Sequence, residues 1–166
     1  MQDDLSLLTL PRSELIVSED WIDDNRHMNA AYYTVAVKDP ALLAHDSWDY
    51  GRDFRRRSNQ SNFVYNAQVV YLRELLLGDR LAVTTLLKET DGKRIRLLFE
   101  IYNADQDYLA ALVQYLVIHV DLGPPPRAVN MPDPLAARLR RVQAAHAGYP
   151  LPPEADRLLA MPLKPR

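Results

Sequence analysis

Two carboxylates and a histidine stand close together just ahead of an apolar segment. Asp23 and Asp24 precede His27, and Asn29 leads into the apolar residues 30–37. A carboxylate can act as a base or as a nucleophile. The first turn of a helix offers open N–H groups and a positive dipole end, both of which stabilise negative charge. The pattern therefore predicts a carboxylate beside a helix start that can hold an oxyanion.

Each of these residues also has a plainer interpretation. Taken from the residues alone, capping of a turn explains Asp23 and Asp24 better than catalysis does. Asp24 is expected to be solvated. His27 is expected to orient the loop by hydrogen bonds, since a lone histidine is weak evidence for acid-base work. The Asn29 side chain is expected to cap the helix that follows.

The composition narrows the class of protein. A chain of 166 residues with 48% hydrophobic and 25% charged residues predicts a single domain over residues 1–166. The lack of cysteine removes disulfides, thiolate nucleophiles and cysteine-ligated zinc. His119 and Asp121 lack a third ligand nearby in sequence, so no metal is expected. A net charge of -2 offers no pull on nucleic acid. With neither a signal peptide nor a long apolar run in sequence, we expect a cytoplasmic protein without a membrane partner.

The first half of the chain is expected to form a strand and a helix. Residues 14–17 favour a short strand. A helix is expected from about Ala30, and its apolar residues on nearly every side predict that it is buried. Pro40 is expected to kink or restart that helix, which continues to about Trp48. The arginine-rich residues 52–57 are interpreted as a solvated loop.

The second half is expected to form a meander of four antiparallel strands. Alternation begins at Asn62, and it places Phe63, Tyr65, Ala67, Val69 and Tyr71 on one face. Strands follow over residues 81–87 and 95–101, joined by a tight turn at Asp91-Gly92. Residues 108–120 are apolar on both faces, so one face is expected to cover the helix and the other to meet a partner subunit.

A helix with a narrow apolar stripe is expected after the sheet. Asp133 is expected to cap it, Pro134 to take its first position and Gly148 to follow its end. The stripe is formed by Leu135, Leu139 and Val142. The proline-rich residues beyond it are expected to be irregular or mobile.

With these elements in place, the motif resembles that of the hotdog-fold acyl-CoA thioesterases. In that family an Asp, three residues, a His, one residue and an Asn lead into the central helix, as Asp23, His27 and Asn29 do here. Further phrases resemble the branch that includes betainyl-CoA thioesterases: Trp21-Ile22-Asp23, Tyr71-Leu72-Arg73-Glu74-Leu75 with Gly78-Asp79, Lys93-Arg94 and His119-Val120-Asp121. The resemblance covers about residues 15–122.

The resemblance implies an α+β hotdog fold, in which an antiparallel sheet wraps around a central buried helix. The core would span about residues 14–122, with an extra C-terminal helix and tail over residues 130–166. Hotdog sites usually lie between subunits, so a homodimer or dimer-based oligomer whose sheets meet is expected.

The resemblance also implies hydrolysis of a small or medium acyl-CoA thioester, with Asp23 as base or nucleophile and the oxyanion held at Ala30. CoA would be part of the substrate, and no cofactor is expected. Arg26 stands where the family usually has glycine, and Gln114 where the betainyl branch is expected to have glutamate. Arg55 and Arg56 are candidates for the CoA phosphates, together with Arg52 and Arg57.

Two alternatives stay open at this stage. Arg26 and Gln114 favour a non-catalytic hotdog module that binds acyl-CoA or acts as a scaffold, because a bulky side chain and a neutral amide replace the expected residues. The other alternative is a cone-shaped fold like that of the ketosteroid isomerases. That group usually places helices before its first strand, whereas here a strand comes first.

Overall fold

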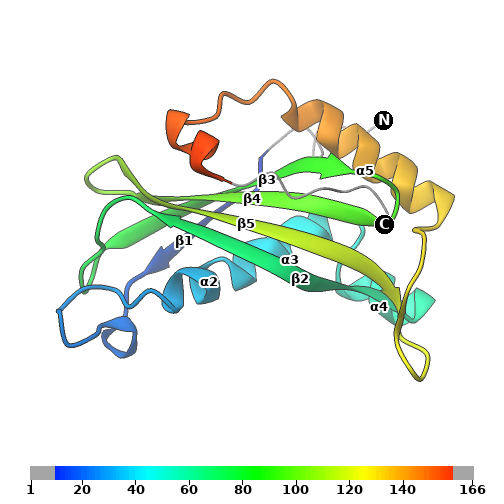
Figure 1. Cartoon of the computed structure of the whole chain (residues 1–166), viewed down its shortest axis with the longest axis horizontal. Coiled ribbons are helices and arrows are strands. Elements are labelled where there is room, and N and C mark those ends of the chain that lie inside the picture. The colour runs from blue at the N-terminus through cyan, green and yellow to red at the C-terminus, as the bar shows by residue number, and fades with distance from the viewer. Residues whose placement is uncertain (1–9, 159–166) are drawn as a thin grey trace.

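The computed structural model describes residues 10–158 and shows a curled antiparallel sheet packed over a layer of short helices (Figure 1). Two short 3-10 turns accompany the regular elements, η1 (Glu19–Trp21) and η2 (Pro153–Arg157). The helices are α2 (Tyr32–Ala36), α3 (Lys38–Ser47), α4 (Arg52–Ser58) and α5 (Asp133–His146). The strands are β1 (Arg12–Ile16), β2 (Gln60–Tyr71), β3 (Arg80–Thr90), β4 (Arg94–Asn103), β5 (Tyr108–Asp121) and β6 (Arg127–Ala128).

The strands run in the order β1-β3-β4-β5-β2, and β6 adds to the end of β5. The expected meander of four strands was therefore wrong. Only β3, β4 and β5 follow one another, while β2 lies at the far edge and pairs with β5. This arrangement gives β5 a partner on both edges, which satisfies the backbone of a strand too apolar to face water.

A bulge in β2 changes which of its side chains face the helices. The register of β2 against β5 shifts between Val64 and Asn66. Val64 lines an inner cavity before the shift and Val69 packs on the core after it, although strict alternation would place these two residues on opposite faces. The uninterrupted alternation expected from Phe63 to Tyr71 was wrong, because the extra residue of a bulge moves the following side chains to the other face.

The central helix is divided in two. The Oδ1 atom of Asn29 accepts a hydrogen bond of 2.9 Å from the N–H of Ala31, and α2 begins at the next residue. The chain breaks at Val37 and α3 begins at Lys38, so the expected restart comes slightly before Pro40, which lies in the first turn of α3. Proline is tolerated there because its missing N–H has no helical partner. Both helices contribute fully buried residues, as expected.

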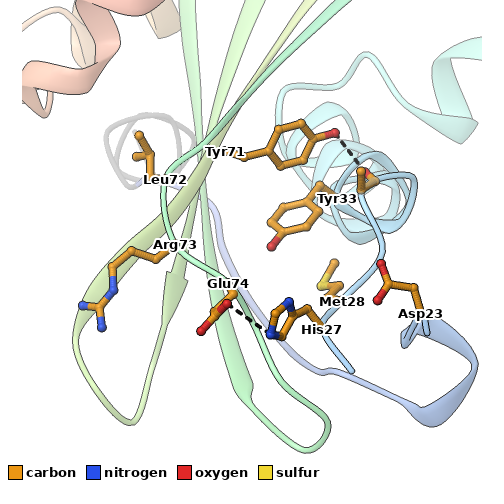
Figure 2. Close-up of a pocket in the computed structure, with 9 residues that line it drawn as sticks. Asp23, His27, Met28, Tyr33, Tyr71, Leu72, Arg73 and Glu74 are labelled. Atoms are coloured by element: carbon orange, nitrogen blue, oxygen red, sulfur yellow. Dashed lines mark hydrogen bonds and ion pairs between the residues drawn. The ribbon is translucent and has the colours of Figure 1, made fainter. Parts of the chain in front are cut away.

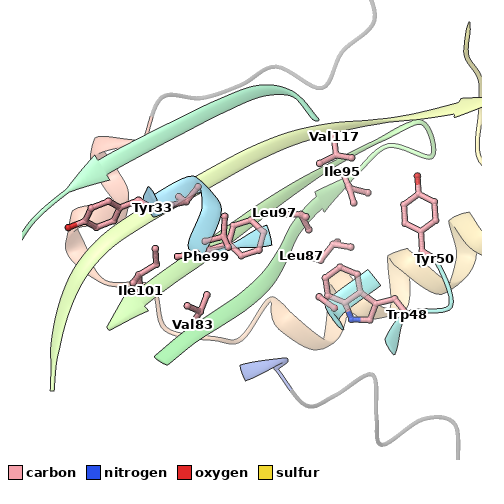
Figure 3. Close-up of a cluster of buried hydrophobic side chains, with 14 of the residues drawn as sticks. Tyr33, Trp48, Tyr50, Val83, Leu87, Ile95, Leu97, Phe99, Ile101 and Val117 are labelled. Atoms are coloured by element: carbon pink, nitrogen blue, oxygen red, sulfur yellow. The ribbon is translucent and has the colours of Figure 1, made fainter. Parts of the chain in front are cut away.

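The main core lies between these helices and the inner face of the sheet. Figure 3 shows Trp48 and Tyr50 beside Leu87, while Phe99 lies nearer the other end of the cluster. Residues 52–58 form α4, so the expected loop was wrong. Phe54 anchors α4 in the core, and the left-handed backbone of Asn59 (φ 54°) ends it.

The last helix covers a free edge of the sheet. Because β1 pairs only with the first half of β3, the backbone N–H groups of Leu87 and Thr90 have no strand beside them. They donate instead to His146 Nδ1 at 3.0 Å and Gln143 Oε1 at 3.2 Å, both on α5. The expected stripe of Leu135, Leu139 and Val142 is buried, but Asp133 is the first residue of α5 rather than its cap.

The segment after α5 lies over the outer face of the sheet. Tyr149 and Leu158 pack on Leu86, Leu98 and Leu112. Leu112 lies on the outer face of β5, the face that was expected to meet a partner subunit, and it is covered by the chain itself. The start of the chain and the end of the proline-rich tail lie outside the described residues. None of the helices within residues 10–158 is long and apolar enough to cross a membrane.

Candidate active site

A pocket of about 340 Å³ lies where the loop before α2 faces the end of β2 (Figure 2). Asp23, His27, Met28 and Ala30 come from the loop, Tyr33 comes from α2, and the opposite wall is the segment that leaves β2. That wall consists of Tyr71, Leu72, Arg73 and Glu74. The structure thus brings Asp23, His27 and Ala30 to one pocket.

Backbone hydrogen bonds hold the loop in a tight turn around Asp23. The Asp23 N–H donates to the carbonyl of His27 at 3.0 Å, and the Asp23 carbonyl accepts from Arg26 N–H at 2.9 Å. The Asp23 carboxylate accepts a further bond of 2.8 Å from Asn25 N–H. Asp23 therefore does cap a turn, and the same turn holds its half-buried carboxylate at the pocket.

Arg26 completes this turn with a left-handed backbone, φ 66°. Glycine adopts that conformation at little cost, which explains a glycine preference at such a position. The Arg26 side chain is exposed and is absent from the pocket lining. Its bulk therefore does not obstruct the approach to Asp23.

His27 ties the loop to the opposite wall. Its Nε2 lies 3.2 Å from Glu74 Oε2. Figure 2 marks this pair with a dashed line. The neighbouring Met28 N–H donates to the Leu75 carbonyl at 2.7 Å. Both contacts join segments far apart in sequence. The geometry suits a residue that orients the loop.

The start of the helix supplies a free donor at the pocket. No residue in the described part of the chain accepts a hydrogen bond from Ala30 N–H, whereas Ala31 N–H is taken by the Asn29 side chain. The Ala30 carbonyl accepts from Tyr71 hydroxyl at 3.0 Å, which fixes the peptide against β2. Ala30 N–H is thus available to a negatively charged oxygen.

Tyr33 forms the floor of the pocket. Its ring meets the Tyr71 ring edge to face with centroids 5.0 Å apart. Burial, assisted by the negative charge that Tyr108, Tyr71 and Glu74 can carry, raises the pKa of Tyr33 to about 12. Its hydroxyl stays protonated at neutral pH and can donate a hydrogen bond.

The other candidate binding residues lie away from this pocket. Gln114 is buried on the outer face of the sheet, 3.5 Å from Gln68, and does not line the Asp23 pocket. Arg55 and Arg56 lie on α4, where Arg56 contacts Asp53. The neighbouring Arg52 and Arg57 are paired with Asp46 and Asp49, at 2.8 and 2.7 Å.

The wall formed by Tyr71, Arg73 and Glu74 was not anticipated as part of the site. Arg73 and Glu74 were noticed only within a family-like phrase, and Tyr71 only there and in the alternating strand. Their place beside Asp23 depends on β2 crossing to the far edge of the sheet, which adjacent sequence does not reveal. No group of three or more metal-binding side chains gathers within residues 10–158.

A second, more apolar cavity of about 430 Å³ lies between the α2–α3 helices and the first half of β2. It is lined mainly by Val35, Ala41, Leu42, Val64, Leu97, Tyr115 and Val117, with Thr34, Asn62 and His45. Lys38 is its charged residue and has no ion-pair partner within residues 10–158. Burial lowers the pKa of His45 to about 4, so its imidazole is neutral at pH 7.

Comparison with known proteins agrees with this architecture. Residues 17–139 match the model of the thioesterase-like superfamily. A betainyl-CoA thioesterase of Pseudomonas aeruginosa is 28% identical over 151 residues, which cover 90% of this chain and 93% of that protein. A solved structure of SAV2348 from Staphylococcus aureus in complex with CoA has a TM-score of 0.80 at 22% identity, covering 93% of this chain and 96% of that one.

A larger relative carries the same unit as one part of its length. The L-carnitine dehydrogenase/betainyl-CoA thioesterase of Agrobacterium fabrum is 34% identical over 144 residues. The match covers 86% of this chain but 28% of that protein. The similarity therefore concerns only a part of the larger protein.

Proposed function

Because the chain belongs to the thioesterase-like superfamily, we propose that it hydrolyses acyl-CoA thioesters and that Asp23 carries the reaction. The observation that supports this role is a carboxylate held at a pocket that also contains a free N–H at the start of the helix. The test is release of free thiol from a panel of acyl-CoA esters by the purified protein. Failure to release thiol from any member would refute it.

The chemistry needs few groups. As a base, the Asp23 carboxylate takes a proton from water while the water oxygen bonds to the carbonyl carbon. The carbonyl oxygen becomes an oxyanion that Ala30 N–H stabilises, and the carbon–sulfur bond then breaks as the carbonyl reforms. A thiol has a pKa of about 8.5, taking cysteine as its model, so the departing thiolate needs little help from an acid. Direct attack by the carboxylate is the alternative, and it forms an anhydride that water then opens.

Two observations weigh against the non-catalytic alternative. Arg26 lies outside the pocket lining, and Gln114 lies on the other face of the sheet. Binding of acyl-CoA without turnover, unchanged by Asp23→Asn, would still select that alternative. The same thiol-release assay therefore distinguishes the two functions.

For the assembly, we propose a homodimer formed through the outer edge of β2. In the described part of the chain no strand pairs with that edge. Phe63, Val64 and Tyr65 on β2 are each 46–49% exposed. An open strand edge with apolar side chains favours pairing with another strand. The edge of β3, by contrast, is protected by α5.

This dimer would also join the two cavities. The Asp23 pocket lies at the Tyr71 end of β2, and the apolar cavity lies near Asn62 at its other end. A twofold axis pairs the two β2 strands in opposite directions, so the end of one strand lies beside the start of the other. The apolar cavity of one subunit then adjoins the Asp23 pocket of its partner, where it can receive the acyl group.

The lining of that cavity favours an uncharged acyl group. Its walls are apolar, His45 is neutral, and no carboxylate is among its lining residues, while Lys38 adds a positive charge. A quaternary ammonium group needs several aromatic faces or an acidic partner to offset its loss of water, whereas this cavity offers the single tyrosine ring of Tyr115 beside the charge of Lys38. We therefore propose a small or medium apolar acyl group in place of the betainyl group of the relatives.

A further inference from the structure

Arg73 has an unusual setting among the residues of the Asp23 pocket. It is exposed, and no residue in the described part of the chain forms an ion pair with it. The adjacent acidic residue, Glu74, is paired with His27 at 3.2 Å. A positive charge at the mouth of the pocket is thus left without a partner.

The guanidinium group of Arg73 is held in place by an aromatic ring. Its central carbon lies 3.7 Å from the centroid of the Tyr108 ring. The Tyr108 hydroxyl donates to the Glu74 carbonyl at 2.8 Å and accepts from Asn103 Nδ2 at 3.3 Å, so the ring cannot turn freely. Stacking of this kind leaves the N–H groups at the edge of the guanidinium plane available.

The backbone at Arg73 is also fixed. The N–H groups of Leu72 and Arg73 both donate to the carbonyl of Ala110, at 2.9 and 3.1 Å. An arginine held at both its backbone and its guanidinium loses little conformational entropy when it binds an anion. This distinguishes Arg73 from the arginines of α4, three of which contact aspartates.

The place of Arg73 indicates which part of a ligand it meets. Leu72, Arg73 and Glu74 line the Asp23 pocket and also a neighbouring surface pocket of about 350 Å³. This surface pocket, which is distinct from the apolar cavity, continues to Leu76, Gln106 and Tyr108. In Figure 2 the Arg73 side chain points away from Asp23, toward the outside of the pocket. A strongly hydrated anion stays at such an exposed place, whereas an acyl group enters the interior.

From this geometry we propose that Arg73, stacked on Tyr108, binds a phosphate group of CoA. The bound CoA portion of the substrate then extends from the Asp23 pocket over Arg73 toward the protein surface. The proposal rests on the proposed function, and it adds a specificity-determining residue for the CoA portion. Guanidinium groups suit phosphate because their paired donors match its oxygens.

The decisive experiment compares two substrates with the same acyl group. One is the acyl-CoA and the other is the acyl-N-acetylcysteamine thioester, which has no phosphate. For Arg73→Gln we expect KM for the acyl-CoA to rise about 10- to 100-fold with kcat nearly unchanged, as for loss of a hydrogen bond to a charged group. Activity on the phosphate-free thioester should stay at the wild-type level.

The matched control is Arg12→Gln. Arg12 is an exposed arginine on β1, at the opposite edge of the sheet from β2. Its substitution should leave kcat and KM for both substrates unchanged. An equal loss on both substrates would overturn the proposal, because Arg73 would then act on the acyl group or on the fold. No change on the acyl-CoA would overturn it as well.

Direct binding separates this proposal from the proposed function. Calorimetry with free CoA should show affinity for the wild-type protein that falls about 10- to 100-fold in Arg73→Gln. If the wild-type protein binds CoA through Arg73 yet cleaves no thioester, hydrolysis fails while the phosphate site stands. If Arg73→Gln binds CoA as tightly as the wild type does, the phosphate site is refuted whatever the activity.

Discussion

The Oδ1 atom of Asp23 accepts a hydrogen bond of 2.8 Å from the backbone N–H of Asn25. An asparagine side chain can make the same bond through its own oxygen, because aspartate and asparagine cap turns equally well. The turn and the chemistry at this position can therefore be separated by one substitution.

The substitution Asp23→Asn should lower kcat by about a hundredfold or more, since general-base contributions are typically ~10² to 10⁴. The melting temperature should stay close to that of the wild type. The matched control Asp24→Asn changes an exposed carboxylate one residue away and should retain activity. An inactive Asp24→Asn with an active Asp23→Asn would move the catalytic role to Asp24.

Arg26→Gly should stabilise the protein without changing turnover. The left-handed region costs a residue with a Cβ roughly 1–2 kcal/mol. Glycine avoids this steric cost, but its greater loss of conformational entropy on folding costs about 0.5–1 kcal/mol. Urea unfolding should show a gain of up to about 1 kcal/mol. The control Asn25→Gly, where no positive φ is present, should lose stability. A fall in turnover of Arg26→Gly would mean that the arginine holds substrate.

Disruption of the β2 edge should produce a monomer. Light scattering at micromolar concentration should give a dimer for the wild type and a monomer for the double variant Phe63→Lys, Tyr65→Lys, which sets like charges against each other across the twofold axis. The monomer should also lose activity, because the acyl cavity would come from the partner subunit. Ile16→Lys, on the other edge strand and 62% exposed, is the control that should stay dimeric. A monomeric wild type would contradict the proposed assembly.

The charge of the acyl group should decide the rate. Betainyl-CoA and tert-butylacetyl-CoA have the same shape and differ by one positive charge. We expect kcat/KM to be at least about tenfold higher for the neutral ester, because about 1.4 kcal/mol of unfavourable charge interaction is enough for that ratio. Lys38→Glu should reduce the preference. Equal rates on the two esters would show that the cavity does not hold the acyl group.

Stability should fall as the pH drops from about 6.5 to 4. Burial lowers the pKa of His45 to about 4, and it also lowers the pKa of His119 and His146. The unfolded chain takes up these protons first, so the folded state loses stability through this interval. His45 alone should contribute about 3 kcal/mol. Burial raises the pKa of Glu100, so the contribution of Glu100 to stability falls as the pH rises. Because this effect has the opposite sign, the contribution of His45 must be measured with a single-site variant. Urea unfolding of His45→Leu at several pH values should show that its free energy of unfolding depends less steeply on pH than that of the wild type.

Local patterns predicted much of the fold because each depends on neighbouring residues. The hairpin at Asp91-Gly92, the long strands and the stripe on α5 follow from turn chemistry and periodicity. The helix α4 was missed because its arginines resemble a solvated loop, while a single buried residue, Phe54, fixes it to the core. One anchoring residue leaves no period in a sequence.

The site was only half visible for a related reason. Asp23, His27 and Ala30 are neighbours in sequence, and their loop could be identified from spacing. Arg73 reaches the same pocket because β2 pairs with β5 instead of β3. Pairing between strands far apart in sequence costs loop-closure entropy, and no local sequence pattern indicates it. Gln114 was a candidate through the family resemblance alone, and strand alternation does not say which face of β5 meets the helices.

The C-terminal cover of the sheet makes folding and assembly separable. Leu86, Leu98 and Leu112 on the outer face of the sheet are shielded by residues of the same chain, so this apolar cluster needs no second molecule to cover it. A subunit that carries its own cover does not need a neighbour to protect its core. Loss of activity in an isolated subunit can then be attributed to a missing half-site, and not to a collapsed structure.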